Sequence, residues 1–192
     1  SVMTQKTFSS ITLYFTLFVI ISILTLLFWD HFHGGVPGHN LLKREDLPKI
    51  SNWWGAIALP VATYISLSKI RKRINFEANF SNQNFIKQHL LPFLIAFVFA
   101  IIIVISSSTG NSEISYSMFK LLFVVAIFIP IYKSEYFLGF VLGLTYTFGG
   151  ALPIIIGLVL VTVFYVIFKF LRPVFVWLGT KIGLLKNNAK NN

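Results

Sequence analysis

Long uncharged runs of apolar residues constrain this fold more than any other feature of the sequence. Residues 11–29 contain 19 residues without an acidic or basic side chain, and residues 136–171 contain 36 residues with one charge, Lys169. A transmembrane helix needs about 20 apolar residues to cross a hydrocarbon core of about 30 Å. Only 11% of the 192 residues are charged, against about 25% in soluble domains. We therefore predict an integral membrane protein.

The apolar runs are continuous, which favours helices over a membrane barrel, whose strands alternate in character over about ten residues. The chain has no cysteine, which excludes disulfides and thiolate metal sites. We expect an all-α fold with one integral membrane domain over residues 1–192. Its six expected transmembrane helices cover residues 11–29, 53–70, 90–106, 118–132, 136–149 and 152–171, and a tail follows at 172–192.

The stretch 136–171 is too long to be one straight span. A helix of 36 residues would measure about 54 Å at 1.5 Å per residue. Gly149 and Gly150, followed by Pro153, form the natural break, because both residue types interrupt helical geometry. This pattern predicts two spans joined by a turn. The alternative is a half-helix that enters the membrane and returns, followed by one span.

The basic residues predict the orientation of the bundle. With six spans, twelve of them fall on one side: Lys6, Lys69, Arg71, Lys72, Arg73, Lys87, Lys133, Lys169, Arg172, Lys181, Lys186 and Lys190. The other side has four: Lys43, Arg44, Lys49 and Lys120. The positive-inside rule then predicts that both termini are cytoplasmic and that the loop 30–51 is outside. We expect a cell membrane protein, in the inner membrane of a bacterium.

The net charge of +10 therefore has mainly a topological meaning. Basic residues beside the spans orient the helices and attract anionic lipid headgroups, so membrane lipids are expected partners. No nucleic-acid recognition motif accompanies them, and a nucleic-acid partner is not expected.

The loop 30–51 concentrates the titratable chemistry of the chain, beginning with DHFHGGVPGHNLLKRED at residues 30–46. Three interpretations of it stay open. The first is a metal site, in which His31 and His33 present two imidazoles the same way on an extended chain. His39 or Asp30 would complete the ligands. Catalytic zinc keeps three protein ligands and one open position, so zinc is the divalent ion expected there.

The second interpretation is an anion site that takes a lipid headgroup or a lipid-linked phosphate. Lys43 and Arg44 would hold the anion, because a guanidinium offers a two-pronged donor to oxyanions. Asn52 and Trp53, where the second span begins, would be the other substrate-binding residues. The catalytic set would be His31, His33 and His39 as acid–base groups, with Asp30 and Asp46 orienting them.

The third interpretation is structural, because loops at the depth of lipid headgroups collect charged residues, histidine and tryptophan without any site. Ser51 or Asn52 would then cap the second span. His89 is predicted on the opposite side of the membrane, as an interfacial histidine at the start of the third span. It cannot join the loop histidines in this topology.

Two further functions stay open beside an enzyme of lipid-linked substrates. A channel or transporter would use the Gly149-Gly150 break, although no ionisable residue lies in the middle of any span, as transporters usually require. A non-catalytic partner subunit would use the loop for docking. The spacing of Gly139 and Gly143 predicts close helix packing. Such small-residue faces also favour a homo-oligomer, without fixing its stoichiometry.

Overall fold

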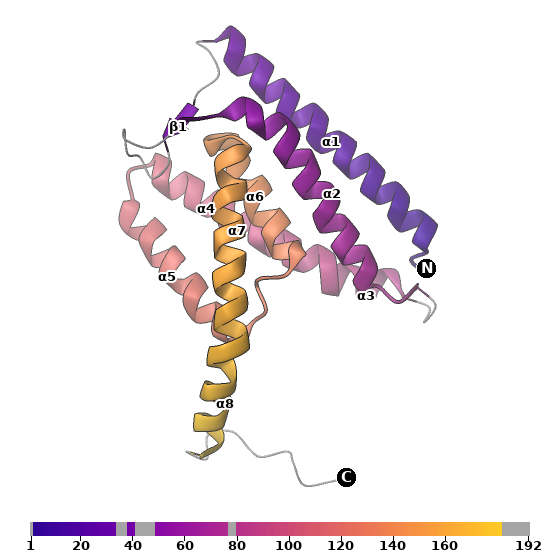
Figure 1. Ribbon diagram of the computed structural model, residues 1–192, viewed down its shortest axis with the longest axis vertical. Coiled ribbons are helices and arrows are strands. Elements are labelled where there is room, and N and C mark those ends of the chain that lie inside the picture. Colours follow the sequence, from indigo (N-terminus) through magenta and orange to yellow (C-terminus); the bar gives the residue numbers. More distant parts are fainter. Residues whose placement is uncertain (1, 34–37, 41–48, 77–79, 182–192) are drawn as a thin grey trace.

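The computed structural model describes residues 2–33, 38–40, 49–76 and 80–181. These residues are helical except for the turns and one short antiparallel ladder, in which His39 pairs with Ile50. The elements in chain order (Figure 1) are α1 Gln5–Phe32, β1 Gly38–Asn40, β2 Lys49–Ser51, the 3-10 turn η2 Asn52–Trp54, α2 Gly55–Arg73, α3 Asn82–Phe85, the π turn η4 Ile86–Leu90, α4 Leu91–Ser108, α5 Ser112–Phe128, α6 Ser134–Phe148, α7 Ala151–Val166, the π turn η5 Ile167–Leu171 and α8 Arg172–Lys181.

Three continuous helices are long and apolar enough to cross a membrane. They run over Gln5–Phe32, Asn82–Ser108 and Ala151–Lys181, with 28, 27 and 31 residues. In the most apolar 18 residues of each helix, only 22 to 28% is buried inside the protein. Most of their apolar side chains therefore face outward, as expected in lipid. The shorter helices α2, α5 and α6 occupy the positions of the other three predicted spans. The helical class is confirmed together with these three span-length helices.

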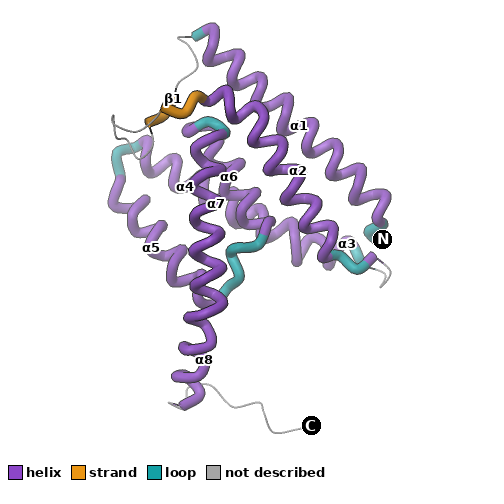
Figure 2. The backbone as a smooth tube through the Cα atoms, in the orientation of Figure 1, coloured by secondary structure: helices purple, strands orange, loops and turns teal. Residues whose placement is uncertain are grey.

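The helices run back and forth between two ends of the bundle (Figures 1 and 2). At one end, which we call the basic end, the backbone N–H of Met3 donates to the carbonyl of Phe80, so the start of α1 lies beside the segment that leads into α3. At the other end, the loop end, the first residue of α2, Gly55, contacts Gly150 in the α6–α7 turn. The β1–β2 ladder lies at the loop end as well.

Helix α6 forms the centre of the bundle and packs closely on α4. A Cβ on Gly139 would collide with the carbonyl oxygen of Phe93, and a Cβ on Gly143 would lie 2.6 Å from the Cβ of Ala100. Only glycine allows the two backbones to approach this closely. The prediction that these two glycines serve helix packing is confirmed.

The predicted break between the last two spans is also confirmed. Helix α6 ends at Phe148, Gly149 adopts a φ of 71°, and α7 begins at Ala151. A positive φ is accessible to glycine at little cost, which explains a sharp turn at this position. Helix α7 then returns along α6, where Gly157 contacts Phe137 and Val141.

The last helix does not end at residue 171, where the predicted span ends. It continues through the π turn at Ile167–Leu171 and past Pro173 to Lys181. A π turn shifts the hydrogen-bond register, which is how a helix accommodates a proline that cannot donate. Ser51 caps the 3-10 turn that leads into α2, since its hydroxyl accepts from the backbone N–H of Trp53, whereas α2 itself has no side-chain cap.

Candidate functional site

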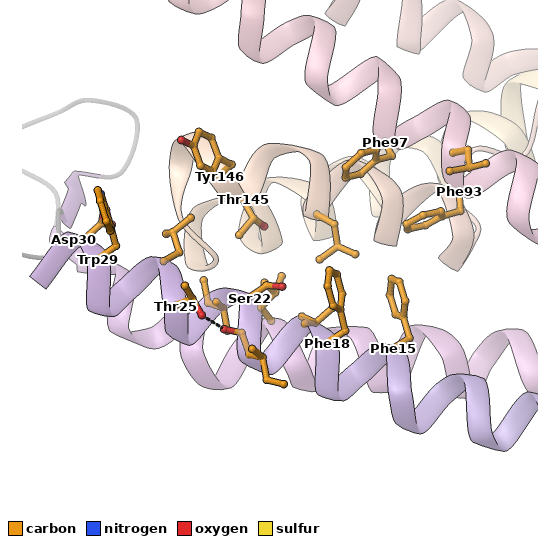
Figure 3. A pocket seen from close by; sticks show the side chains of 17 residues that line it. Phe15, Phe18, Ser22, Thr25, Trp29, Asp30, Phe93, Phe97, Thr145 and Tyr146 are labelled. Carbon is orange, nitrogen blue, oxygen red and sulfur yellow. Dashed lines mark hydrogen bonds between the residues drawn. The ribbon is translucent and has the colours of Figure 1, made fainter.

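A long groove opens between α1 on one side and α4 and α6 on the other (Figure 3). Its volume is about 990 Å³. Phe15 and Phe93 line one end, and Trp29 and Asp30 line the end that meets the loop 30–51. The α1 residues from Phe15 to Asp30 cover about 22 Å at 1.5 Å per residue. Tyr146, on the rim, is 81% exposed, so the groove is open to the surroundings of the bundle.

The groove is apolar along most of its length, and two of its hydroxyls are already satisfied. Thr25 donates to the carbonyl of Ile21 at 2.8 Å, and Thr145 donates to the carbonyl of Val141 at 2.8 Å. Both bonds lie within the residue's own helix, so these hydroxyls do not require water in the groove. Such a surface suits a hydrocarbon chain better than a hydrated ion.

The loop histidines that the structure describes do not converge. Helix α1 continues through Phe32, so the predicted extended chain at His31 and His33 is wrong, and residues two apart on a helix point to different faces. The His33 ring stacks on Trp29 with centroids 4.0 Å apart, whereas the His31 ring meets the edge of Trp53 at 6.3 Å. The two imidazoles therefore cannot act as neighbouring metal ligands in this arrangement.

The hydrogen bond of the His33 ring determines which of its nitrogens carries the proton. Its Nδ1 lies 2.9 Å from the carbonyl oxygen of Trp29. A carbonyl can only accept, so Nδ1 carries the proton in this contact and a neutral ring then has Nε2 as its acceptor. The backbone N–H of His33 also donates to the carbonyl of Asp30, which fixes the residue at the end of α1. Asp30 itself is half-buried at the end of the groove.

The structure does not test most of the remaining predicted site residues, and Trp53, which it describes, does not line the groove. Lys43, Arg44 and Asp46 lie outside the described residues. Nothing is described of the side chains of His39 and Asn52, although the backbone of His39 lies in the ladder and Asn52 begins the 3-10 turn. Within the described part of the chain, no group of three His, Asp or Glu residues could hold a metal ion. A metal set that includes His39 stays a prediction.

A second polar cluster, not predicted from the sequence, lies at the basic end of the bundle. Glu135, the second residue of α6, is 1% exposed. Its Oε2 accepts from Nη2 of Arg73 at 2.7 Å, and its Oε1 accepts from Nδ1 of His89 at 2.5 Å. We call Arg73, His89 and Glu135 the buried triad. It joins α2, the π turn before α4 and α6.

His89 is therefore not the interfacial histidine predicted from the sequence. It is buried, and the rings of Phe80 and Phe85 lie 6.0 and 5.8 Å from its centroid. A buried imidazole needs a hydrogen-bond partner, and Glu135 supplies it. The prediction that His89 lies apart from the loop histidines agrees with its position beside Phe80 at the basic end.

The electrostatics of the buried triad follow from these contacts. Glu135 lies in the polar turn ahead of the predicted span 136–149. Burial raises the pKa of its carboxyl, but the hydrogen bonds from His89 and Arg73 together lower that pKa by more, so the net pKa lies below its ordinary value of 4.5. The carboxylate is therefore ionised at neutral pH and paired with Arg73, whose side chain is 36% exposed. This arrangement suits a structural tie between three helices.

Comparisons with protein-family models, with curated proteins and with solved structures find no match for this chain.

Proposed function

We propose that this chain is a six-span membrane protein that binds a lipid-linked phosphate at the loop end of the groove. The hydrocarbon chain of the ligand lies between α1, α4 and α6. Its phosphate meets the polar loop 30–51. Both termini are cytoplasmic and the loop faces the outside, where a bacterial cell would present such lipids in the outer leaflet of its inner membrane.

The position of the groove carries this proposal. The apolar groove of about 990 Å³ ends at Trp29 and Asp30, where the residues with titratable side chains begin. An amphiphilic ligand needs an apolar surface for its chain next to a polar surface for its headgroup. Tryptophan at the junction matches the preference of its ring for the membrane interface.

Four groups of residues have distinct roles in the proposed site. Lys43 and Arg44 bind the phosphate oxygens through charge-assisted hydrogen bonds. His33 is the acid–base group, because its Nδ1 is engaged by the backbone and Nε2 is its acceptor. Asp30 and Asp46 orient the donors of the site. His31 and His39 are alternative proton carriers, or ligands of a zinc ion whose set includes His39.

Binding of a polyprenyl phosphate to the purified full chain in detergent tests the proposal. Native mass spectrometry would count bound molecules for the phosphate and for the matching polyprenyl alcohol. We expect the phosphate to bind more tightly. Ser22→Phe, which fills the groove, and Arg44→Gln, which removes the proposed anion contact, should each weaken it. The matched control is Lys49→Gln, which removes the same charge from the same loop.

The results separate the proposal from its rivals. Equal binding of phosphate and alcohol, or an equal loss in the Lys49 and Arg44 variants, would contradict a specific phosphate site. Bound zinc that disappears in a His39→Ala variant would favour metal chemistry at the loop. Failure of every lipid to bind would favour a docking subunit. His33→Gln should retain binding and lose any turnover of the ligand.

A transport function through the α6–α7 break has weaker support. Gly150 lies against Gly55, where a Cβ would come within 2.8 Å of the Gly55 backbone, so the turn is closed by packing. The Thr63 hydroxyl is also satisfied within its own helix, by the carbonyl of Leu59 at 2.8 Å.

The orientation has its own test. The chain has no cysteine, so Gly35→Cys introduces a single thiol in the loop. An impermeant maleimide should label it in intact cells, whereas Lys190→Cys in the tail should react only after lysis. The reverse pattern would overturn the topology.

A further inference from the structure

A second hollow, on the opposite face of α1 from the groove, lies between α1 and α2 at the basic end. Its volume is about 300 Å³. The polar α1 residues that line it, Ser9, Thr12 and Thr16, follow each other at helical spacing, beside the apolar Leu13, Leu17 and Ile20. Helix α2 contributes Tyr64, Ser68 and Arg71. We call this hollow the hydroxyl hollow, after its polar residues.

The hydroxyl hollow is more polar than a helix face beside lipid requires. Six of its nine lining residues are polar: five carry hydroxyl groups, and the sixth is an arginine. Lipid-facing surfaces are normally apolar, and polar side chains there mark a partner. The polar residues of the hollow run along α1 from Ser9 to Thr16, about 10 Å at 1.5 Å per residue. That distance covers the headgroup region, roughly 5–8 Å thick on each side of a bilayer.

Thr16 is the independent sign of a missing partner. Ser9 donates to the carbonyl of Gln5 at 3.0 Å, and Thr12 donates to the carbonyl of Phe8 at 3.0 Å. The Thr16 hydroxyl oxygen is buried and has no hydrogen-bond partner among the residues that the structure describes. Leaving a buried hydroxyl unpaired costs free energy, which a ligand that accepts its proton would recover.

We infer that the hydroxyl hollow binds the headgroup of an anionic glycerophospholipid. The phosphate lies against the guanidinium of Arg71, which matches an oxyanion with two donors. The glycerol ester carbonyl lies deeper and accepts from the Thr16 hydroxyl, which a rotation of the Thr16 side chain brings to the wall of the hollow. Basic pockets between membrane helices bind anionic headgroups in this manner. The inference depends on the membrane architecture proposed above but not on the ligand of the groove.

Titration of phosphatidylglycerol into the purified full chain, monitored by native mass spectrometry, tests the site. Arg71→Gln should weaken binding at least about tenfold, because it removes a charge-assisted hydrogen bond. Thr16→Val, which keeps the shape of the side chain, should weaken it about two- to tenfold. Lys72→Gln is the matched control, since it removes an equal charge at the same end from a residue that does not line the hollow.

The outcomes decide between a site and a charged surface. Equal losses in the Arg71 and Lys72 variants, or full affinity in Thr16→Val, would overturn the inference. Glycerol 3-phosphate tests for a soluble ligand, and displacement of the lipid by it at equal concentration would overturn the assignment to lipid. The Arg44→Gln variant should bind phosphatidylglycerol normally, so loss of the groove ligand alone leaves this inference intact. The Arg71, Lys72 and Arg44 variants should melt at the wild-type temperature in detergent, and Thr16→Val should melt at that temperature or above it, because valine removes an unpaired buried hydroxyl.

Discussion

Replacing Glu135 with glutamine should destabilise the bundle more than replacing either of its partners. The carboxylate is 1% exposed and accepts one hydrogen bond through each oxygen. Glutamine has the same shape but only one acceptor oxygen. Its amide group would therefore face a donor, either Nη2 of Arg73 or Nδ1 of His89. The variant loses a hydrogen bond and creates an unfavourable contact without opening a cavity.

The magnitude follows from the burial of each partner. A hydrogen bond to a charged group contributes about 1.5–3 kcal/mol, so we expect Glu135→Gln to cost about 2–4 kcal/mol once the buried donor is left unpaired. Arg73→Gln should cost only about 1 kcal/mol, because water reaches that 36% exposed side chain and screens its charge. His89→Phe should cost about 1–2 kcal/mol, since the new ring keeps the packing with Phe80 and Phe85.

Unfolding of the purified chain in mixed micelles, titrated with sodium dodecyl sulfate and monitored by circular dichroism, measures these free energies. The double variant Arg73→Gln/Glu135→Gln should lose less than the sum of the single variants, by about 0.5–3 kcal/mol, because the two residues share one contact. Arg73→Gln costing as much as Glu135→Gln would refute the reasoning, as would additive effects in the double variant.

Three further predictions concern pH, packing and the α4–α5 turn. The pKa of Glu135 lies below its ordinary value of 4.5. The stabilising contribution of its carboxylate should therefore be complete above pH 4.5 and lost as the pH falls through the lowered pKa. The unfolding midpoints of wild type and Glu135→Gln should then converge in acid. Gly143→Ala should lower the unfolding free energy by about 1–3 kcal/mol, since its Cβ would lie 2.6 Å from Ala100, and an unchanged midpoint would contradict the close packing. Ser115→Ala should cost about 1 kcal/mol in the same titration, because it removes the hydrogen bonds to Ser106 at 2.7 Å and to Ser107 at 3.0 Å. No loss would show that these two bonds contribute nothing.

The positions of the helices could be predicted because the signal is local. An uncharged run of spanning length predicts one helix, and Gly149-Gly150 interrupts a stretch that is too long for one span. The ends of the helices were harder to predict. Helix α1 begins at Gln5, six residues before the uncharged run, because the Thr4 hydroxyl accepts from the N–H of Thr7 at 3.1 Å. The length of an uncharged run reflects the thickness of the hydrocarbon core, whereas capping residues determine where the helix begins and ends.

The groove and the divergence of the loop histidines could not be predicted, because both depend on how helices pack. The spacing of His31 and His33 predicts a shared direction only if the chain is extended, and no local signal ended α1 before them. The Trp29 ring instead stacks on His33, four residues later on the same helix face. The groove exists because three helices diverge, and hydropathy does not carry that information.

The buried triad was implicit in the charge distribution, although no motif connects its members. Arg73 and Glu135 are 62 residues apart, and His89 and Glu135 are 46 apart. Yet the six predicted spans place all three at the same end, where basic residues are abundant. An acidic side chain at the start of a span can be buried only with a partner that compensates its charge. Glu135 adjoins the span 136–149, so a cation of that end is its expected partner. Applied to every charged residue beside a span, the same rule predicts ion pairs between helices from the sequence alone.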